Sequence, residues 1–506
     1  MPSYKYAVYP SAKIVDSKGK EINHLLWGDW VEMRSDEQPR GKMLPVFARG
    51  TSGWMHEDDL QDEQILEVVF VDVGQGDGCL VVTPDNRHLI VDAGISDNMY
   101  RHLKWRYNGF RTRWKFDAAI ITHPDKDHYY GFRKLFEEPN VTFGTLYHNG
   151  IIETRVRKEP LGRMRRVDGV RYVAELMEDR DTLAHFLNSR RWRHPTRKQF
   201  DKQYPALLKS ALDSGRVDDI RMLSTHHSDE GFVPGFGKRR TLRLRVLGPV
   251  ADVDASGRAR LRVFGDKPGS RAFNISKTKN GHSVILQLEY RNLRLLFGGD
   301  LNSPAEVHLL QHYSGVDDPW PWQPEVEQAV IEGAAPVLGA DITKLCHHGS
   351  SDFTDTFMKA VAATATVISS GDNEPYAHPR SDTLGAIGLH GHGWRPLIFS
   401  TELARSSREE EGITREEIGR MHERIHAETD PGRRADLEVR QAALFDRLLE
   451  RNVVVYGSIY LRSDGNRVVM GYKLERERRS GGRLTRWDIY TLTRRGNAPL
   501  AFEGGA

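Results

Sequence analysis

The stretch FDAAIITHPDKDH, residues 116–128, decides the fold of this 506-residue chain. Its first half is an apolar run typical of a strand with both faces buried, and the run ends at Thr122. Two histidines and two aspartates follow at once: His123, Asp125, Asp127 and His128. A strand end fixes the position of the loop, so the loop can aim all four side chains at one point. Imidazoles and carboxylates together suit Zn²⁺, or Mn²⁺ where carboxylates dominate, so the stretch predicts a metal site rather than only a polar turn that caps a helix.

Five further motifs surround this stretch between about residues 66 and 400. They are DVGQGD at 72–77, DAG at 92–94, GD at 299–300, HHGS at 347–350 and HP at 378–379. Together with HxDxDH at 123–128, their order resembles the hydrolase domain of DNA-uptake competence proteins. That domain is a branch of the metallo-β-lactamase superfamily, in which HxHxDH is the commonest metal motif. The resemblance implies an α/β fold, the αββα sandwich of a metal-dependent hydrolase.

The resemblance also implies two divalent metal ions, Zn²⁺ or Mn²⁺, bridged by the carboxylate of Asp300. The other implied ligands are His123 and Asp125 for one ion, Asp127 and His128 for the second, and one of His347 and His348, which the sequence does not distinguish. His282 lies near the place of a further family histidine, and it is either a ligand or a turn histidine. Asp125 stands where the commonest pattern has histidine, so this oxygen ligand favours Mn²⁺ or weakens the first site.

Catalysis by such a centre uses a metal-bound hydroxide that attacks either the phosphorus of a phosphoryl group or the carbon of a carbonyl group. The expected catalytic side chains are Asp127 and His378. His378 is expected to hold a phosphate or to protonate a leaving group, the alternative being an ordinary loop histidine. Asp72 and Asp92 end predicted strands and are expected to brace the metal ligands as hydrogen-bond acceptors. The glycine-rich DVGQGDG segment is expected to form a tight turn beneath the metals.

The pattern of elements divides the chain into three parts. Residues 1–62 read as short strands with Gly turns and resemble a bacterial SH3-like β-barrel, most closely in GWMHEDDL at 53–60. Residues 65–401 form the expected hydrolase domain, with a basic helical insertion at about 150–245. Residues 402–506 read as charged amphipathic helices, which a break at Pro431 would divide into an antiparallel pair, followed by strands. Together they make a C-terminal α+β extension.

The insertion carries the main signal for a substrate, because residues 154–198 hold 13 Lys/Arg against 6 Asp/Glu. Basic clusters can follow a phosphate backbone, and Trp105, Trp114 and Trp192 can stack on bases. The residues expected to bind nucleic acid are Arg155, Arg157, Lys158, Arg190, Arg191 and Arg193. A solvated helix face is the alternative interpretation of the same charges.

Three functions remain open at this point. The first is a phosphodiesterase or nuclease that acts on nucleic acid or nucleotides, and the second is a small-molecule esterase, lactonase or phosphorylcholine-esterase-like hydrolase. The third is a non-enzymatic interaction protein on a decayed hydrolase fold, whose SH3-like and C-terminal parts bind protein partners. Two cysteines, a net charge of +3, no apolar run long enough to span a membrane and no signal-peptide pattern predict a cytoplasmic protein without a membrane partner.

Overall fold

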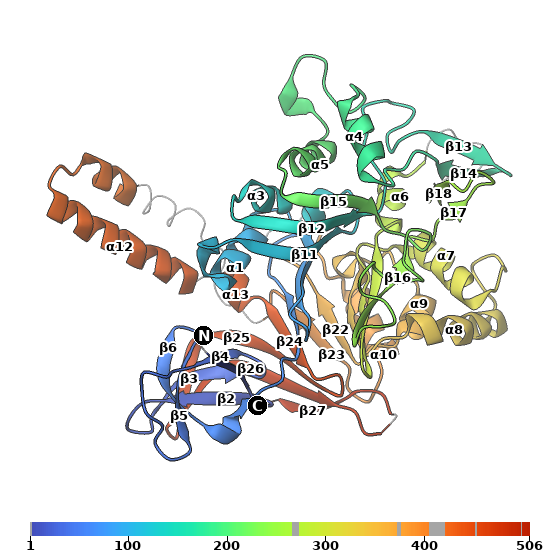
Figure 1. Ribbon diagram of the computed structural model, residues 1–506. Helices are drawn as coiled ribbons and strands as arrows, with labels where there is room; N and C mark the ends of the chain where they lie inside the picture. Colours follow the sequence, from blue (N-terminus) through green and yellow to red (C-terminus); the bar gives the residue numbers. More distant parts are fainter. Residues whose placement is uncertain are drawn as a thin grey trace.

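Two β-sheets packed face to face lie at the centre of the computed structural model, which describes residues 3–265, 273–371, 376–403, 420–450, 453–496 and 498–505 (Figure 1). The first sheet has ten strands in the order β15 (Val217–Met222), β12 (Val141–His148), β11 (Trp114–Ile121), β10 (His88–Ala93), β9 (Gly78–Val82), β8 (Leu66–Phe70), β24 (Ile459–Ser463), β25 (Arg467–Ser480), β26 (Arg483–Thr493) and β27 (Ala501–Gly505). The second sheet has six strands in the order β16 (Leu242–Gly248), β19 (Ile285–Tyr290), β20 (Leu293–Phe297), β21 (Ile342–Lys344), β22 (Ala365–Ile368) and β23 (Leu397–Ser400).

Strand β8 shows why the central strands are apolar on both faces. Because side chains alternate along a strand, Leu66, Val68 and Phe70 enter the core between the sheets. Val69 and the following Val71 belong to a second core beneath helices. The helices of that core are α1 (Asn98–Arg106), α3 (Phe132–Glu137), α4 (Arg180–Asn188) and α5 (Gln203–Asp213). The second sheet is covered by α7 (Ser303–Ser314), α8 (Pro324–Leu338), α9 (Asp355–Val361) and α10 (Ser381–His390). The predicted αββα sandwich is confirmed.

The N-terminal residues form a seven-stranded sheet around a small core of their own. Its strands are, in spatial order, β3 (Glu21–Leu26), β2 (Ser11–Val15), β6 (Thr51–His56), β5 (Met43–Ala48), β4 (Trp30–Met33), β1 (Ser3–Ala7) and β7 (Leu60–Gln61), with the short helix η1 (Glu57–Asp59) before β7. Ile14, Leu25, Val31 and Val46 are fully buried in its core. A small β unit is therefore present where the sequence predicts one, and its SH3-like character stays a prediction.

The insertion differs from the predicted helical segment. Besides α4, η3 (Lys198–Phe200) and α5, it contains a hairpin of β13 (Met164–Val167) and β14 (Val170–Val173). This hairpin joins β18 (Ala259–Arg262) and β17 (Asp252–Val253) in a four-stranded sheet, which therefore combines residues from before and after β16. Strand β15, inside the predicted boundaries, belongs to the first central sheet. These strands are hard to recognise in the sequence because their apolar stretches are short and lie between arginines.

The C-terminal strands are a part of the central sandwich rather than a separate layer. β24 pairs antiparallel with β8, and β25–β27 extend the same sheet beside the N-terminal unit (Figure 1). The predicted charged helices are represented by residues 420–427 and α12 (Pro431–Glu450), with the short α13 (Val453–Tyr456) after it, whereas residues 404–419 lie outside the described residues. Among the helices that the structure describes, none is both long enough and apolar enough to cross a membrane.

A buried ion network fixes the N-terminal unit to this extended sheet. Arg462 of β24 is fully buried, with its guanidinium 3.4 Å from Asp29 and 3.1 Å from Glu67. Arg49 lies 2.6 Å from Asp29, and Arg106 lies 2.7 Å from Glu67. Burial alone would raise the pKa of Asp29, but the guanidinium groups around it lower that pKa to about 2. Each buried charge thus has a partner, as buried charges require.

Candidate metal centre

The metal motif begins directly after β11, at the edge of the sheet where the neighbouring parallel strand β10 also ends. The backbone N–H and the hydroxyl of Thr122 donate to the carboxylate of Asp92 at 2.8 and 2.7 Å. His123 follows directly, and His128 lies in the short helix α2 (Lys126–Tyr129), with both side chains fully buried. Parallel pairing of β10 with β11 therefore sets where the motif starts, and α2 turns His128 back toward His123.

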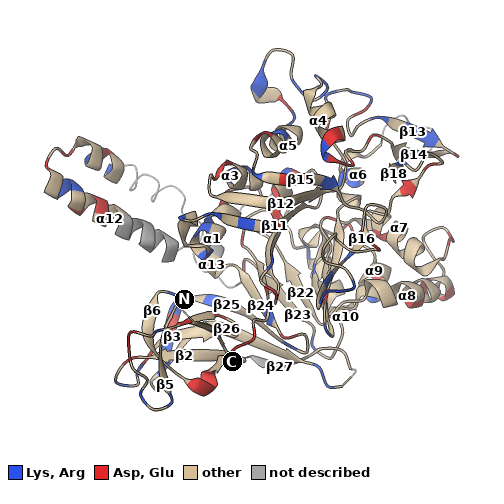
Figure 2. Ribbon diagram, viewed as in Figure 1, with Lys and Arg blue, Asp and Glu red and all other residues tan. Residues whose placement is uncertain are grey.

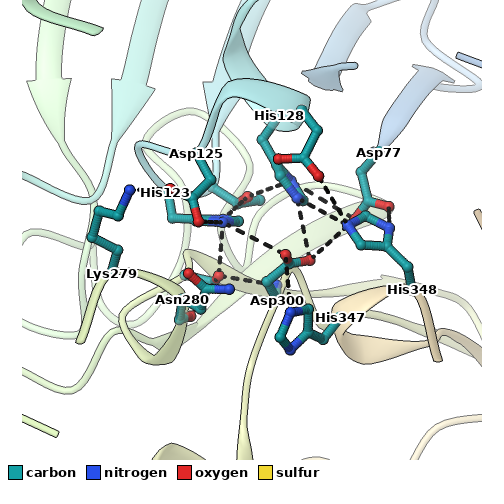
Figure 3. Close-up of polar contacts among 12 residues, drawn as sticks. Asp77, His123, Asp125, His128, Lys279, Asn280, Asp300, His347 and His348 are labelled. Atoms are coloured by element: carbon teal, nitrogen blue, oxygen red, sulfur yellow. Dashed lines mark hydrogen bonds and ion pairs between the residues drawn. The ribbon is translucent and has the colours of Figure 1, made fainter. Parts of the chain in front are cut away.

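Asp300 lies at the centre of the cluster, between two sets of imidazoles (Figure 3). Its Oδ1 is 3.2 Å from Nε2 of His128 and 3.3 Å from Nε2 of His348. Its Oδ2 is 3.7 Å from Nε2 of His123 and 4.0 Å from Nε2 of His347. One carboxylate thus presents each of its oxygens to a different pair of histidines, which is the arrangement that a bridging ligand needs.

The turn in HHGS separates the two histidines that the sequence could not distinguish. In η4 (Cys346–Gly349), His347 and His348 have φ values of 50° and 52°, an uncommon left-handed conformation for residues other than glycine. His348 Nε2 lies 3.3 Å from His128 Nε2 and 3.8 Å from Asp127 Oδ2, and these three residues form one of the possible ligand groups. His347 faces the other side of Asp300, toward His123, at a quarter exposure of its side chain. We therefore assign His348 to the group that contains Asp127 and His128.

Two buried carboxylates orient the histidines of that group. Asp92 Oδ2 is 2.8 Å from Nδ1 of His128, and Asp77 Oδ1 is 3.2 Å from Nδ1 of His348, which also lies 3.2 Å from the carbonyl oxygen of Ser369. Each ring is therefore held at Nδ1 and points Nε2 at the centre, the usual arrangement of a metal-ligating histidine. Lys344, itself buried, contacts the other oxygen of Asp77. The sequence prediction missed Asp77 and Lys344, although Asp77 closes the DVGQGD motif, for which the sequence predicts only a turn.

Asp125 lies beside the cluster with its carboxylate already engaged. Oδ1 contacts the ammonium group of Lys279, which comes from α6 (Ile275–Gly281). Oδ2 is 3.7 Å from Nε2 of His123. It also accepts a hydrogen bond of 2.9 Å from the side-chain amide of Asn280, when that amide is oriented so that its nitrogen faces acceptors. Asp125 belongs to none of the groups of three or more ligand atoms that lie within 4.8 Å of one another in the described residues.

The residues of the centre fit a divalent cation on two observations. Among the described residues, His123 Nε2 and Asp300 Oδ1 are buried and have no hydrogen-bond partner, which is costly unless another group binds them. Burial alone would raise the pKa of Asp300, but the neighbouring imidazoles lower it well below its usual range. Burial alone would lower the pKa of His128, but Asp300 and Asp92 raise it well above its usual range. The carboxylates thus attract positive charge to a point where imidazole and carboxylate atoms converge.

Two predicted site residues have other roles. His282 is buried, but its Nε2 lies 2.5 Å from the carbonyl oxygen of Arg262 and its ring packs against Phe264 at 4.7 Å. Burial lowers the pKa of His282 to about 3, so it is a neutral core histidine, and we correct the ligand interpretation. Asp72 accepts from the backbone N–H of Gly74 at 3.1 Å and shapes the 72–77 turn.

His378 lies at the edge of the centre, half-buried. Its ring centroid is 5.7 Å from that of His347 and 6.5 Å from that of His348. The exposed Tyr376 stacks on it at 5.9 Å. The predicted catalytic histidine is thus brought next to the metal cluster rather than into it.

The basic residues of the insertion divide into two kinds. Arg191 is ion-paired with Glu175 at 2.5 Å and with Glu159 at 2.9 Å, while Trp192 is buried and donates to the carbonyl of Leu187. Arg193 and Arg155 donate to carbonyl groups of the insertion, although Arg155 is itself exposed, and Arg157, Lys158 and Arg190 are exposed. Figure 2 shows that acidic residues at the start of α4 accompany the basic ones around β13 and β18. The exposed charges are therefore fewer than the sequence count.

Comparison with known proteins gives one family and distant relatives. The family model described as "Metallo-beta-lactamase superfamily" matches residues 72–329. A segment of 203 residues, 37% of this chain, is 23% identical to ComE operon protein 3 of Bacillus subtilis (strain 168), and it spans only 23% of that relative. Among solved structures, a CmlA beta-hydroxylase mutant has a TM-score of 0.28 at 9% identity over 66% of this chain and 51% of its own. A long form RNase Z from yeast has a TM-score of 0.27 at 10% identity over 69% and 47%.

Proposed function

This chain belongs to the metallo-beta-lactamase superfamily and has the hydrolase fold of that family, and we propose that it is a metal-dependent phosphodiesterase or nuclease acting on nucleic acid or nucleotides. The observation that carries the proposal is the position of Asp300, whose two oxygens face two separate pairs of imidazoles. A centre of this kind matches a reaction in which two oxygens on one phosphorus are stabilised together.

The proposed ligands fall on either side of Asp300. Asp127, His128 and His348 would hold one divalent ion, and His123 with Asp125 would face the other, with His347 on the same side. Ions bound there would supply activated water and Lewis acidity for hydrolysis. The mixture of imidazole and carboxylate ligands suits Zn²⁺ and Mn²⁺.

The chain itself supplies the proton chemistry. His378 lies beside His347 at the edge of the cluster, in contact with solvent on one side. Because a general acid must reach both the leaving group and water, this position suits donation of a proton to the departing oxygen. Asp77 and Asp92 hold the rings of His348 and His128 in one orientation, which avoids a reorganisation cost during the reaction.

The proposed substrate is a phosphodiester because the insertion carries exposed, positively charged side chains. Arg157, Lys158 and Arg190 are exposed, and all three belong to the basic region of residues 154–198. Such residues bind a phosphate backbone through charge, without reading sequence. A cytoplasmic location and protein partners of the N- and C-terminal parts stay expectations from the sequence.

The test is a substrate panel with the full chain loaded with Mn²⁺ or Zn²⁺. We expect cleavage of bis-p-nitrophenyl phosphate and of at least one of single-stranded DNA, double-stranded DNA, RNA or a cyclic nucleotide. Asp300→Asn should abolish cleavage, and the exposed Asp318→Asn serves as the matched control. Hydrolysis of carboxyl esters or lactones with no cleavage of any phosphodiester would contradict the proposal and favour the small-molecule esterase.

A further inference from the structure

The side chain of Lys279 takes the place beside Asp125 that a first metal ion would use. Its ammonium group contacts Asp125 Oδ1 (Figure 3). The same group lies 3.4 Å from the carbonyl oxygen of Pro124 and 3.7 Å from Glu153 Oε1. Only 13% of the Lys279 side chain is exposed. The ammonium group is thus a fixed positive charge that water screens weakly.

The two aspartates of the motif therefore differ in what they can offer a metal ion. Asp125 is paired with Lys279 and receives the amide of Asn280, so both of its oxygens have partners. Asp127 receives the amide of Gln75 at 3.2 Å, and among the described residues no Lys or Arg forms an ion pair with it. A cation at Asp125 must displace or tolerate a neighbouring ammonium, and a cation at Asp127 has no such competitor.

We propose that Lys279 makes the two metal positions unequal, with tight binding at Asp127, His128 and His348 and weak binding at His123 and Asp125. The ammonium group of Lys279 then neutralises the carboxylate of Asp125, the residue that stands where histidine is commonest in the family. The chain would hold one ion firmly and take a second only at high metal concentration or together with an anionic substrate. This inference rests on the proposed metal centre.

The test is a titration of the chelator-treated full chain with Mn²⁺ alone. Isothermal titration calorimetry gives the number of ions and their affinities, and electron paramagnetic resonance distinguishes an isolated Mn²⁺ from a coupled pair. For the wild type we expect one tight ion with the spectrum of isolated Mn²⁺, and a second ion bound about 100-fold more weakly, at the upper end of what groups surrounding metal ligands contribute.

Lys279→Met should tighten the second ion by about 10–100-fold and produce the coupled spectrum at two equivalents. Lys277→Met is the matched control, because Lys277 lies on the same helix but pairs with Asp352 at 3.3 Å, and it should change neither affinity. Lys279→Gln, which keeps a hydrogen-bond donor for Asp125, replaces the methionine variant if that variant fails to fold.

Two equal and tight ions in the wild type would overturn the inference while leaving the proposed function intact. A folded Lys279 variant with an unchanged second affinity would also overturn it. A folded wild-type chain that binds no Mn²⁺ in this titration would instead overturn the proposed metal centre and, with it, both proposals.

Discussion

Replacing Asp77 by asparagine should weaken both the fold and the metal centre, because this one carboxylate has two buried partners. It contacts the ammonium of Lys344 and lies 3.2 Å from Nδ1 of His348. The side chains of Asp77 and Lys344 are only 9% and 5% exposed. Removing one member of a buried ion pair leaves the other charge unpaired, at a cost of about 3–5 kcal/mol. Loss of a charged group that orients a ligating histidine lowers metal affinity by about 10–100-fold.

The two effects can be separated with a second substitution. Lys344→Met in the Asp77→Asn background removes the unpaired ammonium, so it should restore most of the stability without restoring metal affinity. The assays are urea unfolding of the metal-free chain, followed by tryptophan fluorescence, and calorimetric titration with Mn²⁺. Glu327→Gln is the control, because its pair with Lys359 is partly exposed and should be worth less than about 1 kcal/mol. Wild-type stability of Asp77→Asn, or recovery of metal affinity in the double variant, would refute the reasoning.

Three further substitutions test other parts of the structure. Burial raises the pKa of Glu306 to about 8, so the folded state keeps a proton that the unfolded state loses near its ordinary value of 4.5. Stability should therefore fall by roughly 5 kcal/mol as pH rises from 4.5 to 8, and Glu306→Gln should flatten the urea midpoints measured across this range, whereas parallel profiles would contradict the assignment. Arg191→Ala should cost about 1–2 kcal/mol in urea unfolding, because its pairs with two glutamates are partly buried; an unchanged midpoint would show that these pairs contribute nothing. Arg157→Ala should leave stability within about 0.5 kcal/mol and lower the salt dependence of DNA binding by about one charge in fluorescence anisotropy, and equal slopes would exclude it from the interface.

The sequence predicts the sandwich and the centre of the site because both depend on local patterns. A strand such as β11 must end at a sheet edge, and a polar loop after it must carry His123 and Asp127 near the neighbouring strand ends. The GD motif follows β20 in the facing sheet, so Asp300 meets them across the sandwich. Order along the chain therefore translates into position in space for these residues.

Contacts between distant segments could not be predicted in this way. Lys344 and Asp77 are 267 positions apart, and Lys279 and Asp125 are 154 apart, so neither pair has a local signature. The C-terminal strands show the same limit, because β24 pairs with β8 from the other end of the chain. A charge count likewise does not reveal that Arg191 is paired inside the insertion.

The metal content of the purified chain, compared with that of Asp300→Asn, tests the central claim most directly. Inductively coupled plasma mass spectrometry after dialysis against Mn²⁺ or Zn²⁺ should find at least one ion per wild-type chain. Asp300→Asn should lose that ion, because Asp300 contacts His128 and His348 on one side and His123 on the other. Less than one ion per folded wild-type chain, or an unchanged content in Asp300→Asn, would contradict the account.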